Sequence, residues 1–195
     1  MSIYPWGRYR AKGMIFWKLI MIKLISKVKS ETLADLRSFC RETTSLMTSD
    51  VSNYAKGRYR LWLFHECNLS NGKITKSYHN DRLWNFCQRV YPGTNIGLLT
   101  FGGNINGIHS TGLIKEHRDH GYSRAIPAER FAIARTVNLG SCVFHYDGKE
   151  YQLNDGDIIE FNCKKLHGVT KILSEERFSI NLWQLNQEKG YYPVV

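Results

Sequence analysis

The 195-residue sequence lacks the cysteine pattern of a disulfide-stabilised or zinc-binding protein. Its five cysteines are scattered, their number is odd, and no two of them form a C-x-x-C pair. Secreted disulfide frameworks and structural zinc sites use even or closely spaced sets of cysteines. We therefore expect reduced thiols and an intracellular, cytoplasmic protein.

The sequence also lacks a hydrophobic run long enough to cross a membrane. Its most apolar stretch, residues 14–26, contains Lys18 and Lys23 and falls short of the roughly 20 apolar residues that a transmembrane helix needs. No small-residue cleavage site follows this stretch, and the region is poor in Arg and Ser. Both features disfavour a signal or transit peptide. We expect a buried strand or helix packed on the core, with a membrane-surface anchor as the alternative.

Acidic residues are missing before Glu31, and basic charge is concentrated in the same part of the chain. Residues 1–60 hold 12 Lys and Arg against 4 Asp and Glu, whereas residues 61–195 hold 15 against 13. The first part therefore carries +8 of the net charge of +10. A basic surface favours a nucleic acid or another anionic partner, and a solvated basic arm is the competing interpretation.

Basic and aromatic residues are interleaved between positions 58 and 89. Such residues together can stack on bases and clamp the backbone of a nucleic acid. The same mixture is typical of an exposed helix face or a sheet rim, which is the interpretation we prefer. The residues are Arg58, Tyr59, Arg60, Trp62, Lys73, Lys76, Tyr78, Arg82, Trp84 and Arg89.

No Pro/Gly-rich linker divides the chain, and its length suits a single domain, residues 1–195. Ser30, followed by apolar residues at 33, 36 and 39, predicts a capped helix start. Residues 81–90 predict a second helix. We expect residues 1–92 to form a basic segment and a helical support or lid, and residues 93–195 to form the core.

Short apolar or alternating runs, separated by turn residues, follow Pro92. Asp147-Gly148 is a strong hairpin signal, and residues 154–157 predict another turn. This texture predicts an α+β fold, mainly β, in which an antiparallel sandwich or barrel is covered on one face by the preceding helices. The predicted strands are residues 96–101, 108–115, 131–139, 142–146, 150–153, 158–161, 167–172 and 177–185.

Three polar motifs lie in order within these strands: His117-Arg118-Asp119, His167 and Arg177-Phe178-Ser179. Residues i and i+2 of a strand share a face, so His117 and Asp119 can reach one ion. Two imidazoles and one carboxylate form the facial triad of non-haem iron(II) oxygenases. Its open positions accept a chelating keto acid and dioxygen. Arg177 offers a planar fork for the far carboxylate of the keto acid, and Ser179 adds a hydroxyl.

Residues 113–185 resemble the double-stranded β-helix core of the Fe(II)/2-oxoglutarate dioxygenase superfamily. The resemblance rests on the three motifs above, on Val137-Asn138-Leu139-Gly140 and on His167-Gly168-Val169. AlkB-like members are most similar in pattern, and prolyl-hydroxylase-like members are next.

The resemblance implies a jelly-roll catalytic core with the N-terminal helices packed against one face. It implies that His117, Asp119 and His167 bind Fe(II), and that Arg177 and Ser179 bind the C5 carboxylate of 2-oxoglutarate. With dioxygen, such an enzyme hydroxylates or oxidatively demethylates a C–H or N-methyl substrate and releases succinate and carbon dioxide. A nucleobase or a protein side chain is the expected substrate.

Position 183 departs from the AlkB-type pattern. Such enzymes usually carry a second arginine six residues after the first, and this chain has Trp183 there. We expect Trp183 to face inward with Arg177, Ser179 and Asn181, and we interpret it as a core residue rather than a cofactor contact. The departure argues against a nucleic-acid demethylase, but not against an oxygenase.

Two other functions stay open at this point. A cupin-like metalloenzyme would need no keto acid, but cupins usually show His-x-His followed by Glu, which this sequence lacks. A non-catalytic jelly-roll binding module with affinity for nucleic acid would hold no iron. The presence of all three ligand types argues against such a module.

Overall fold

The computed structural model describes residues 22–68, 74–75, 77–119, 133–184 and 191–193. Its helices are α1 (Ser30–Glu42), the short 3-10 helix η1 (Thr43–Leu46) and α2 (Asp81–Val90). Its strands are β1 (Lys23–Lys27), β2 (Thr48–Ser49), β3 (Tyr59–Leu63), β4 (His65–Asn68), β5 (Ile74–Thr75), β6 (Ile96–Ile105), β7 (Ile108–Thr111), β8 (Ile114–His117), β9 (Ile133–Leu139), β10 (Cys142–Tyr146), β11 (Lys149–Leu153), β12 (Asp157–Asn162), β13 (His167–Ile172), β14 (Arg177–Trp183) and β15 (Tyr191–Pro193).

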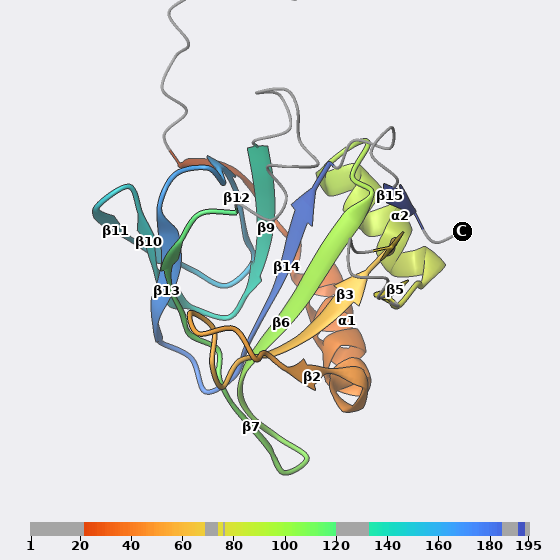
Figure 1. Cartoon of the computed structure of the whole chain (residues 1–195), viewed down its shortest axis with the longest axis horizontal. Helices are drawn as coiled ribbons and strands as arrows, with labels where there is room; N and C mark the ends of the chain where they lie inside the picture. Colours follow the sequence, from red (N-terminus) through yellow and green to blue (C-terminus); the bar gives the residue numbers. More distant parts are fainter. Residues whose placement is uncertain (1–21, 69–73, 76, 120–132, 185–190, 194–195) are drawn as a thin grey trace, which may run out of the picture.

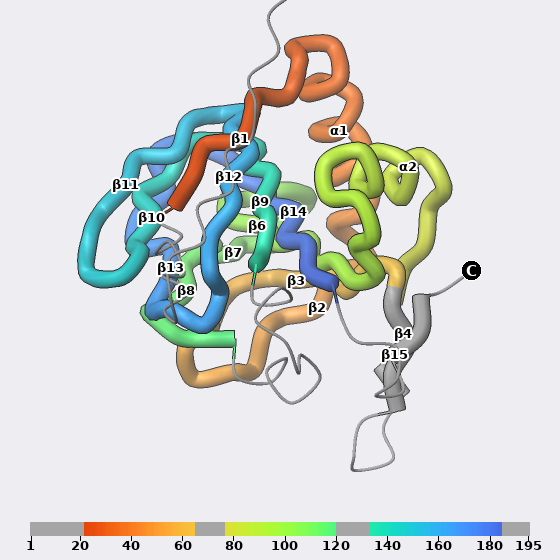
Figure 2. The backbone as a smooth tube through the Cα atoms, turned by 90° about the horizontal axis from the view of Figure 1, so that it is seen from above, coloured from red at the N-terminus to blue at the C-terminus, as the bar shows by residue number. Residues whose placement is uncertain are grey.

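Two antiparallel sheets form the body of the structure. The large sheet has the order β1-β12-β9-β14-β6-β3-β2, with β7 paired to β6, and the small sheet has the order β11-β10-β13-β8. A third sheet, β15-β4-β5, is smaller. Figures 1 and 2 show the large sheet in the middle, the small sheet on one side of it and both α-helices on the other. The predicted mainly-β jelly roll with helices against one face is therefore confirmed.

Strand β14 shows how the large sheet packs against the helices on one face and against the small sheet on the other. Successive side chains of a strand point to opposite faces. Phe178, Ile180 and Leu182 are fully buried in the cluster that also contains residues of both α-helices, and each such side chain stabilises the fold by about 1.5–3 kcal/mol. The alternate residues of β14 face the small sheet, and they include the polar residues described below.

The two helices differ in how they begin. Helix α2 has the predicted bounds, and the Asn80 side chain caps it by accepting a hydrogen bond from the Leu83 N–H at 3.0 Å. The predicted side-chain cap of α1 is wrong, because Ser30 is the first helical residue and the preceding Lys29 provides no side-chain cap. Helix α1 is held instead by its packing, with Leu36 buried against the large sheet.

The turns decide where the predicted strands end. Asp147 (φ 49°) and Gly148 (φ 79°) both have positive φ and connect β10 to β11, as the hairpin signal predicted. The single strand predicted over residues 108–115 is wrong, because the chain breaks there into β7 and β8. At the break, Gly112 has a φ of +60°, and a Cβ on it would lie 2.6 Å from the Cα of Gly102.

The N-terminal part contributes more strands than the sequence predicted. Strand β1 forms the edge of the large sheet by pairing with β12, and β3 pairs with β6 inside it. In β1, Ile25 packs against the core but Leu24 is 58% exposed. The predicted strand packed on the core is therefore present at Ile22 and Ile25, but the expected burial is wrong for Lys23, Leu24 and Ser26, which are exposed. Residues 14–21 lie outside the described residues.

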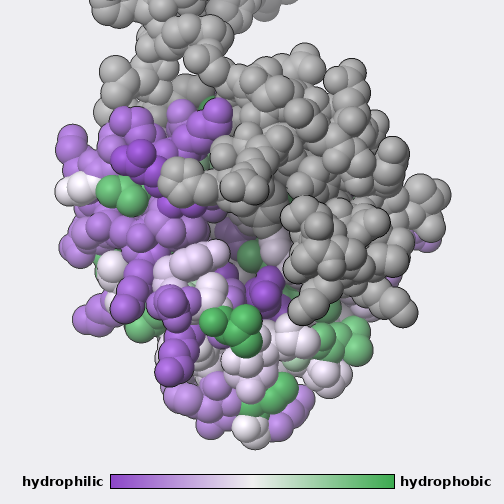
Figure 3. All heavy atoms as spheres, in the orientation of Figure 1, coloured by the Kyte–Doolittle hydropathy of each residue, from purple (hydrophilic) through white to green (hydrophobic). Residues whose placement is uncertain are grey.

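The coloured part of the surface in Figure 3 is mostly hydrophilic, with isolated hydrophobic residues. Scattered exposed apolar residues of this kind are normal for a protein surface and need no partner to cover them. Among the described helices, none is long and apolar enough to cross a membrane.

Candidate active site

His117 and His167 are direct partners across two neighbouring strands. They end β8 and begin β13, and the register of the small sheet pairs them, so that their ring centroids lie 4.4 Å apart. Gly168 permits this approach, because a Cβ at that position would lie only 2.6 Å from the carbonyl oxygen of Ile114 on β8. The pairing of β8 with β13 therefore brings together two histidines that are 50 positions apart in the sequence.

Asp119 completes the group from the segment that follows β8. Its backbone N–H donates to the carbonyl of Cys163 at 3.0 Å, which fixes the chain at this point. Asp119 Oδ1 lies 3.4 Å from His117 Nε2 and 3.5 Å from His167 Nε2. Among the described residues, His117, Asp119 and His167 form the group of ligand side chains that could hold a metal ion, with their ligand atoms within 4.8 Å of one another.

Both imidazoles are oriented by backbone carbonyls. His117 Nδ1 lies 3.0 Å from the carbonyl oxygen of Lys115, and His167 Nδ1 lies 2.8 Å from that of Lys165. A carbonyl can only accept, so each Nδ1 carries the proton and each Nε2 keeps its lone pair. The two Nε2 lone pairs and Asp119 Oδ1 thus meet at one point, and the donor set fits a facial-triad metal.

The Asp119 carboxyl is buried and held in its charged form. Burial raises its pKa, but the neighbouring His117 and His167 side chains outweigh burial and keep the pKa well below its usual range. The other carboxylate oxygen, Oδ2, accepts a hydrogen bond from the Trp183 indole Nε1 at 3.0 Å. Trp183 faces inward and is buried, as predicted, but its interpretation as core alone is incomplete, because it contacts a proposed metal ligand.

Arg177 and Ser179 lie together on β14, facing the small sheet as their i, i+2 spacing predicted. Arg177 is 3% exposed, and its Nε donates to Asn138 Oδ1 at 2.8 Å. Burial lowers the pKa of its guanidinium from the ordinary value, which means that this buried cation lacks the solvation it has in water. Ser179 Oγ lies 2.7 Å from the hydroxyl of Thr100 on β6.

Arg58 lies close to Arg177, which the sequence did not predict. It is 8% exposed, so its interpretation as an exposed surface residue is wrong. Its Nη2 donates to Asp50 Oδ2 at 2.8 Å, while its buried Nε has no hydrogen-bond partner among the described residues. The charge of Arg58 also lowers the pKa of Arg177. No local signal identifies this burial, because Arg58 precedes β3 and its ion pair with Asp50 depends on the intervening turn.

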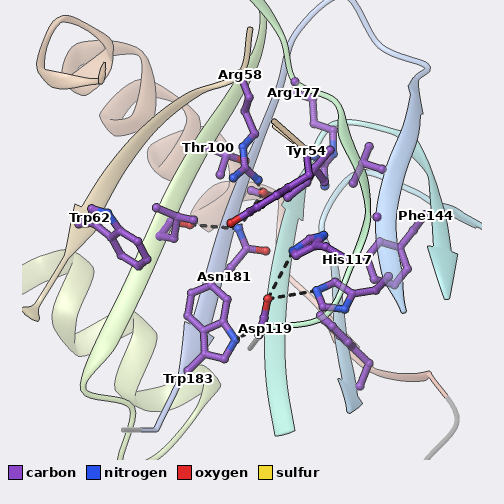
Figure 4. A pocket seen from close by; sticks show the side chains of 18 residues that line it. Tyr54, Arg58, Trp62, Thr100, His117, Asp119, Phe144, Arg177, Asn181 and Trp183 are labelled. Carbon is purple, nitrogen blue, oxygen red and sulfur yellow. Dashed lines mark hydrogen bonds and ion pairs between the residues drawn. The ribbon is translucent and has the colours of Figure 1, made fainter. Parts of the chain in front are cut away.

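Both groups of residues line one cavity between the two sheets. Its volume of about 110 Å³ is several times the roughly 30 Å³ that one water molecule occupies in the liquid. Figure 4 shows Arg58 and Arg177 at one end of the cavity and His117 and Asp119 at the other. The ring of Tyr54 stacks on His117, with centroids 5.0 Å apart and planes 14° apart.

No family model matches the sequence, and no curated protein matches it. Solved structures do match the fold. OsALKBH1 is 12% identical, with a TM-score of 0.61 over 84% of this chain and 95% of that chain. The α-ketoglutarate-dependent non-haem epimerase SnoN from nogalamycin biosynthesis is 9% identical, with a TM-score of 0.54 over 85% of this chain and 75% of that chain.

A 2OG-Fe(II) oxygenase family oxidoreductase from Burkholderia pseudomallei is 13% identical, with a TM-score of 0.51 over 84% of this chain and 80% of that chain. All three similarities extend well beyond the strands that carry the histidines and the aspartate. The chain therefore has the double-stranded β-helix fold of the 2-oxoglutarate- and iron(II)-dependent oxygenases.

Proposed function

We propose that this protein is a non-haem iron(II) oxygenase that uses 2-oxoglutarate as its co-substrate. The observation that carries the proposal is the arrangement of one cavity, with His117, Asp119 and His167 converging at one end and the buried Arg177 at the other. A ligand that combines a metal-chelating group with a distant carboxylate matches both ends.

The metal end is built to bind a divalent cation facially. His117 and His167 present neutral Nε2 atoms, and Asp119 presents one negative oxygen, so three coordination positions stay open. Fe(II) bound there, with the keto acid and dioxygen, supplies the oxidation of a C–H bond. The protein holds the three ligands and surrounds them with buried side chains such as Phe144 and Phe161.

The arginine end is built to bind a carboxylate. Arg177 provides a charged fork, Ser179 and Thr100 provide hydroxyls, and Arg58 provides a second positive charge. Asp50 neutralises part of the charge of Arg58, so an anionic ligand would compensate the remainder. We propose that the C5 carboxylate of 2-oxoglutarate lies between Arg177 and Ser179, on the side that Arg58 faces.

For the substrate, we propose a C–H bond or N-methyl group of a nucleobase or a protein side chain. The cavity is lined by the aromatic rings of Tyr54 and Trp62, and Tyr54 is 47% exposed. The guanidinium of Arg60 lies 5.6 Å from the ring centroid of Trp62. Partly exposed aromatic rings beside a basic group support the binding of a planar or anionic substrate.

The direct experiment is succinate formation from 2-oxoglutarate under air, with and without added Fe(II). The parent protein should form succinate only with iron, and His167→Ala should abolish it. His145→Ala is the matched control, because His145 hydrogen-bonds to Glu116 and Glu150 outside the cavity. Equal turnover by the parent and His167→Ala would contradict the proposal.

A further inference from the structure

The two oxygens of the Asp119 carboxylate have different surroundings. Oδ1 faces both imidazole Nε2 atoms, at 3.4 Å and 3.5 Å. Oδ2 accepts the hydrogen bond from Trp183 Nε1 at 3.0 Å. Figure 4 shows His117 on one side of Asp119 and the Trp183 indole on the opposite side.

Trp183 is well placed to keep this arrangement. It is 5% exposed and packs in the hydrophobic cluster between the two sheets, which restrains its ring. It ends β14, whose alternate residues Arg177, Ser179 and Asn181 line the same cavity. An indole N–H can only donate, and its natural acceptor here is the carboxylate oxygen that does not face the histidines.

We propose that Trp183 is a positioning residue that keeps Asp119 bound to the metal through Oδ1 alone. The inference rests on the proposed function and deepens it. A carboxylate can bind a metal through one oxygen or through both. If Asp119 used both, it would occupy one of the three positions that the keto acid and dioxygen need. The hydrogen bond from Trp183 holds Oδ2 at a distance from the metal, so the coordination position that Oδ2 would take stays open.

This role explains what the tryptophan does at the position where AlkB-type sequences carry a second arginine. A residue that donates a hydrogen bond to Asp119 without adding a charge leaves the full negative charge of the carboxylate for the metal. The cavity then contains the two cations Arg58 and Arg177 at its far end, so positive charge is concentrated where the distal carboxylate of the co-substrate lies.

The test uses Co(II) as the probe, without dioxygen chemistry. Trp183→Phe keeps the buried ring and removes the donor, whereas Trp183→Gln keeps a donor and removes the ring. We expect Trp183→Phe to weaken Co(II) binding by about 10- to 100-fold, the usual range for a lost outer-shell partner. It should also change the Co(II) absorption spectrum and weaken 2-oxoglutarate binding to the Co(II)-loaded protein. Trp183→Gln should be closer to the parent in all three measurements.

Trp84→Phe is the matched control, because Trp84 lies on α2 and packs edge-to-face on Phe64, at a ring-centroid distance of 4.9 Å. It should bind Co(II) as the parent does, and thermal unfolding should show that all variants fold. A purely structural role for Trp183 predicts the opposite order, with Trp183→Phe like the parent and Trp183→Gln impaired, and that order would overturn the inference.

The outcomes also separate the inference from the proposed function. A parent protein that binds Co(II) but not 2-oxoglutarate would end the proposed function, while the Co(II) affinities and spectra of the two Trp183 variants would still decide the role of Trp183. A parent that binds no Co(II) at all would overturn both.

Discussion

The two ends of the cavity are built in different ways. At the metal end, all three ligands come from the small sheet and the segment that follows it, and two of them are cross-strand partners. At the arginine end, Arg177 and Ser179 come from β14, Thr100 comes from β6, and Arg58 comes from the segment that precedes β3. One end is local in the fold, whereas the other is assembled across the large sheet.

The difference teaches which kind of recognition leaves a trace in a sequence. A metal needs lone pairs at fixed distances, and here direct strand pairing supplies His117 and His167, while Asp119 follows just beyond the end of β8. A carboxylate needs positive charge and donors, which many positions around a cavity can supply. The two ends should therefore respond differently to mutation. Loss of the metal end should abolish binding of both the metal and 2-oxoglutarate, whereas loss of the arginine end should weaken only 2-oxoglutarate binding.

Breaking the metal end should have the largest effect. Asp119→Ala removes the only negative ligand of the described group and leaves two imidazoles. We expect metal binding, and with it 2-oxoglutarate binding and succinate formation, to fall to background. Calorimetric titration with Co(II), followed by 2-oxoglutarate, measures both. Metal affinity equal to that of the parent would contradict the assignment of this end.

Breaking the arginine end should leave metal binding intact. Arg177→Ala removes a buried charge that pairs with a carboxylate, a loss of about 2–5 kcal/mol, so the Kd for 2-oxoglutarate should rise about 30- to 4,000-fold. Co(II) affinity should stay at the parent value. Arg177→Lys keeps the charge without the fork and should fall between the two. Equal loss of Co(II) affinity would show that the two ends are not separate.

Arg58 gives a sharper test within the arginine end. Arg58 and Arg60 both form ion pairs with Asp50, at 2.8 Å and 3.4 Å, but only Arg58 lines the cavity. Arg58→Ala should therefore weaken 2-oxoglutarate binding by about tenfold, since 1.4 kcal/mol is lost from a partly neutralised charge. Arg60→Ala is the control and should bind 2-oxoglutarate as the parent does. A similar loss in both variants would assign Arg58 to the structure of the Asp50 ion pair alone.

The smallest effect is expected at Ser179. Ser179→Ala removes one hydroxyl, which contributes about 0.5–1.5 kcal/mol as a neutral hydrogen bond, and Thr100 on β6 remains beside it. The Kd for 2-oxoglutarate should rise about two- to tenfold, with Co(II) affinity unchanged. A loss as large as that of Arg177→Ala would mean that Ser179, rather than Arg177, dominates this end.

The sequence was most informative where the fold is most regular. The alternation of short runs after Pro92 predicted the antiparallel core, and the spacing of His117, Asp119 and His167 predicted a group that the structure brings together. The same period-2 rule placed Arg177 and Trp183 on one face of β14. The predictions for the core and for β14 depend on strand geometry, which is the same in every sheet. Asp119 instead lies just beyond β8, where its backbone bond to Cys163 fixes its position.

Interactions between distant segments left no such signal. Trp183 donates to Asp119, 64 positions away, and nothing in the local sequence identifies that acceptor. Arg58 is buried because Asp50 pairs with it across the turn before β3, whereas charged residues in an alternating segment are usually exposed. The missing cap at Ser30 has a similar cause, because packing of α1 on the sheet replaces the local signal.

The most direct test of the account is calorimetric binding of 2-oxoglutarate to the parent protein under anaerobic conditions, with and without Fe(II). We propose that the two carboxylates of 2-oxoglutarate bind at opposite ends of one cavity, so we expect tight binding with Fe(II) and weak or no binding without it. Binding of equal strength in both conditions, or none in either, would contradict the claim that His117, Asp119, His167 and Arg177 form a single co-substrate site.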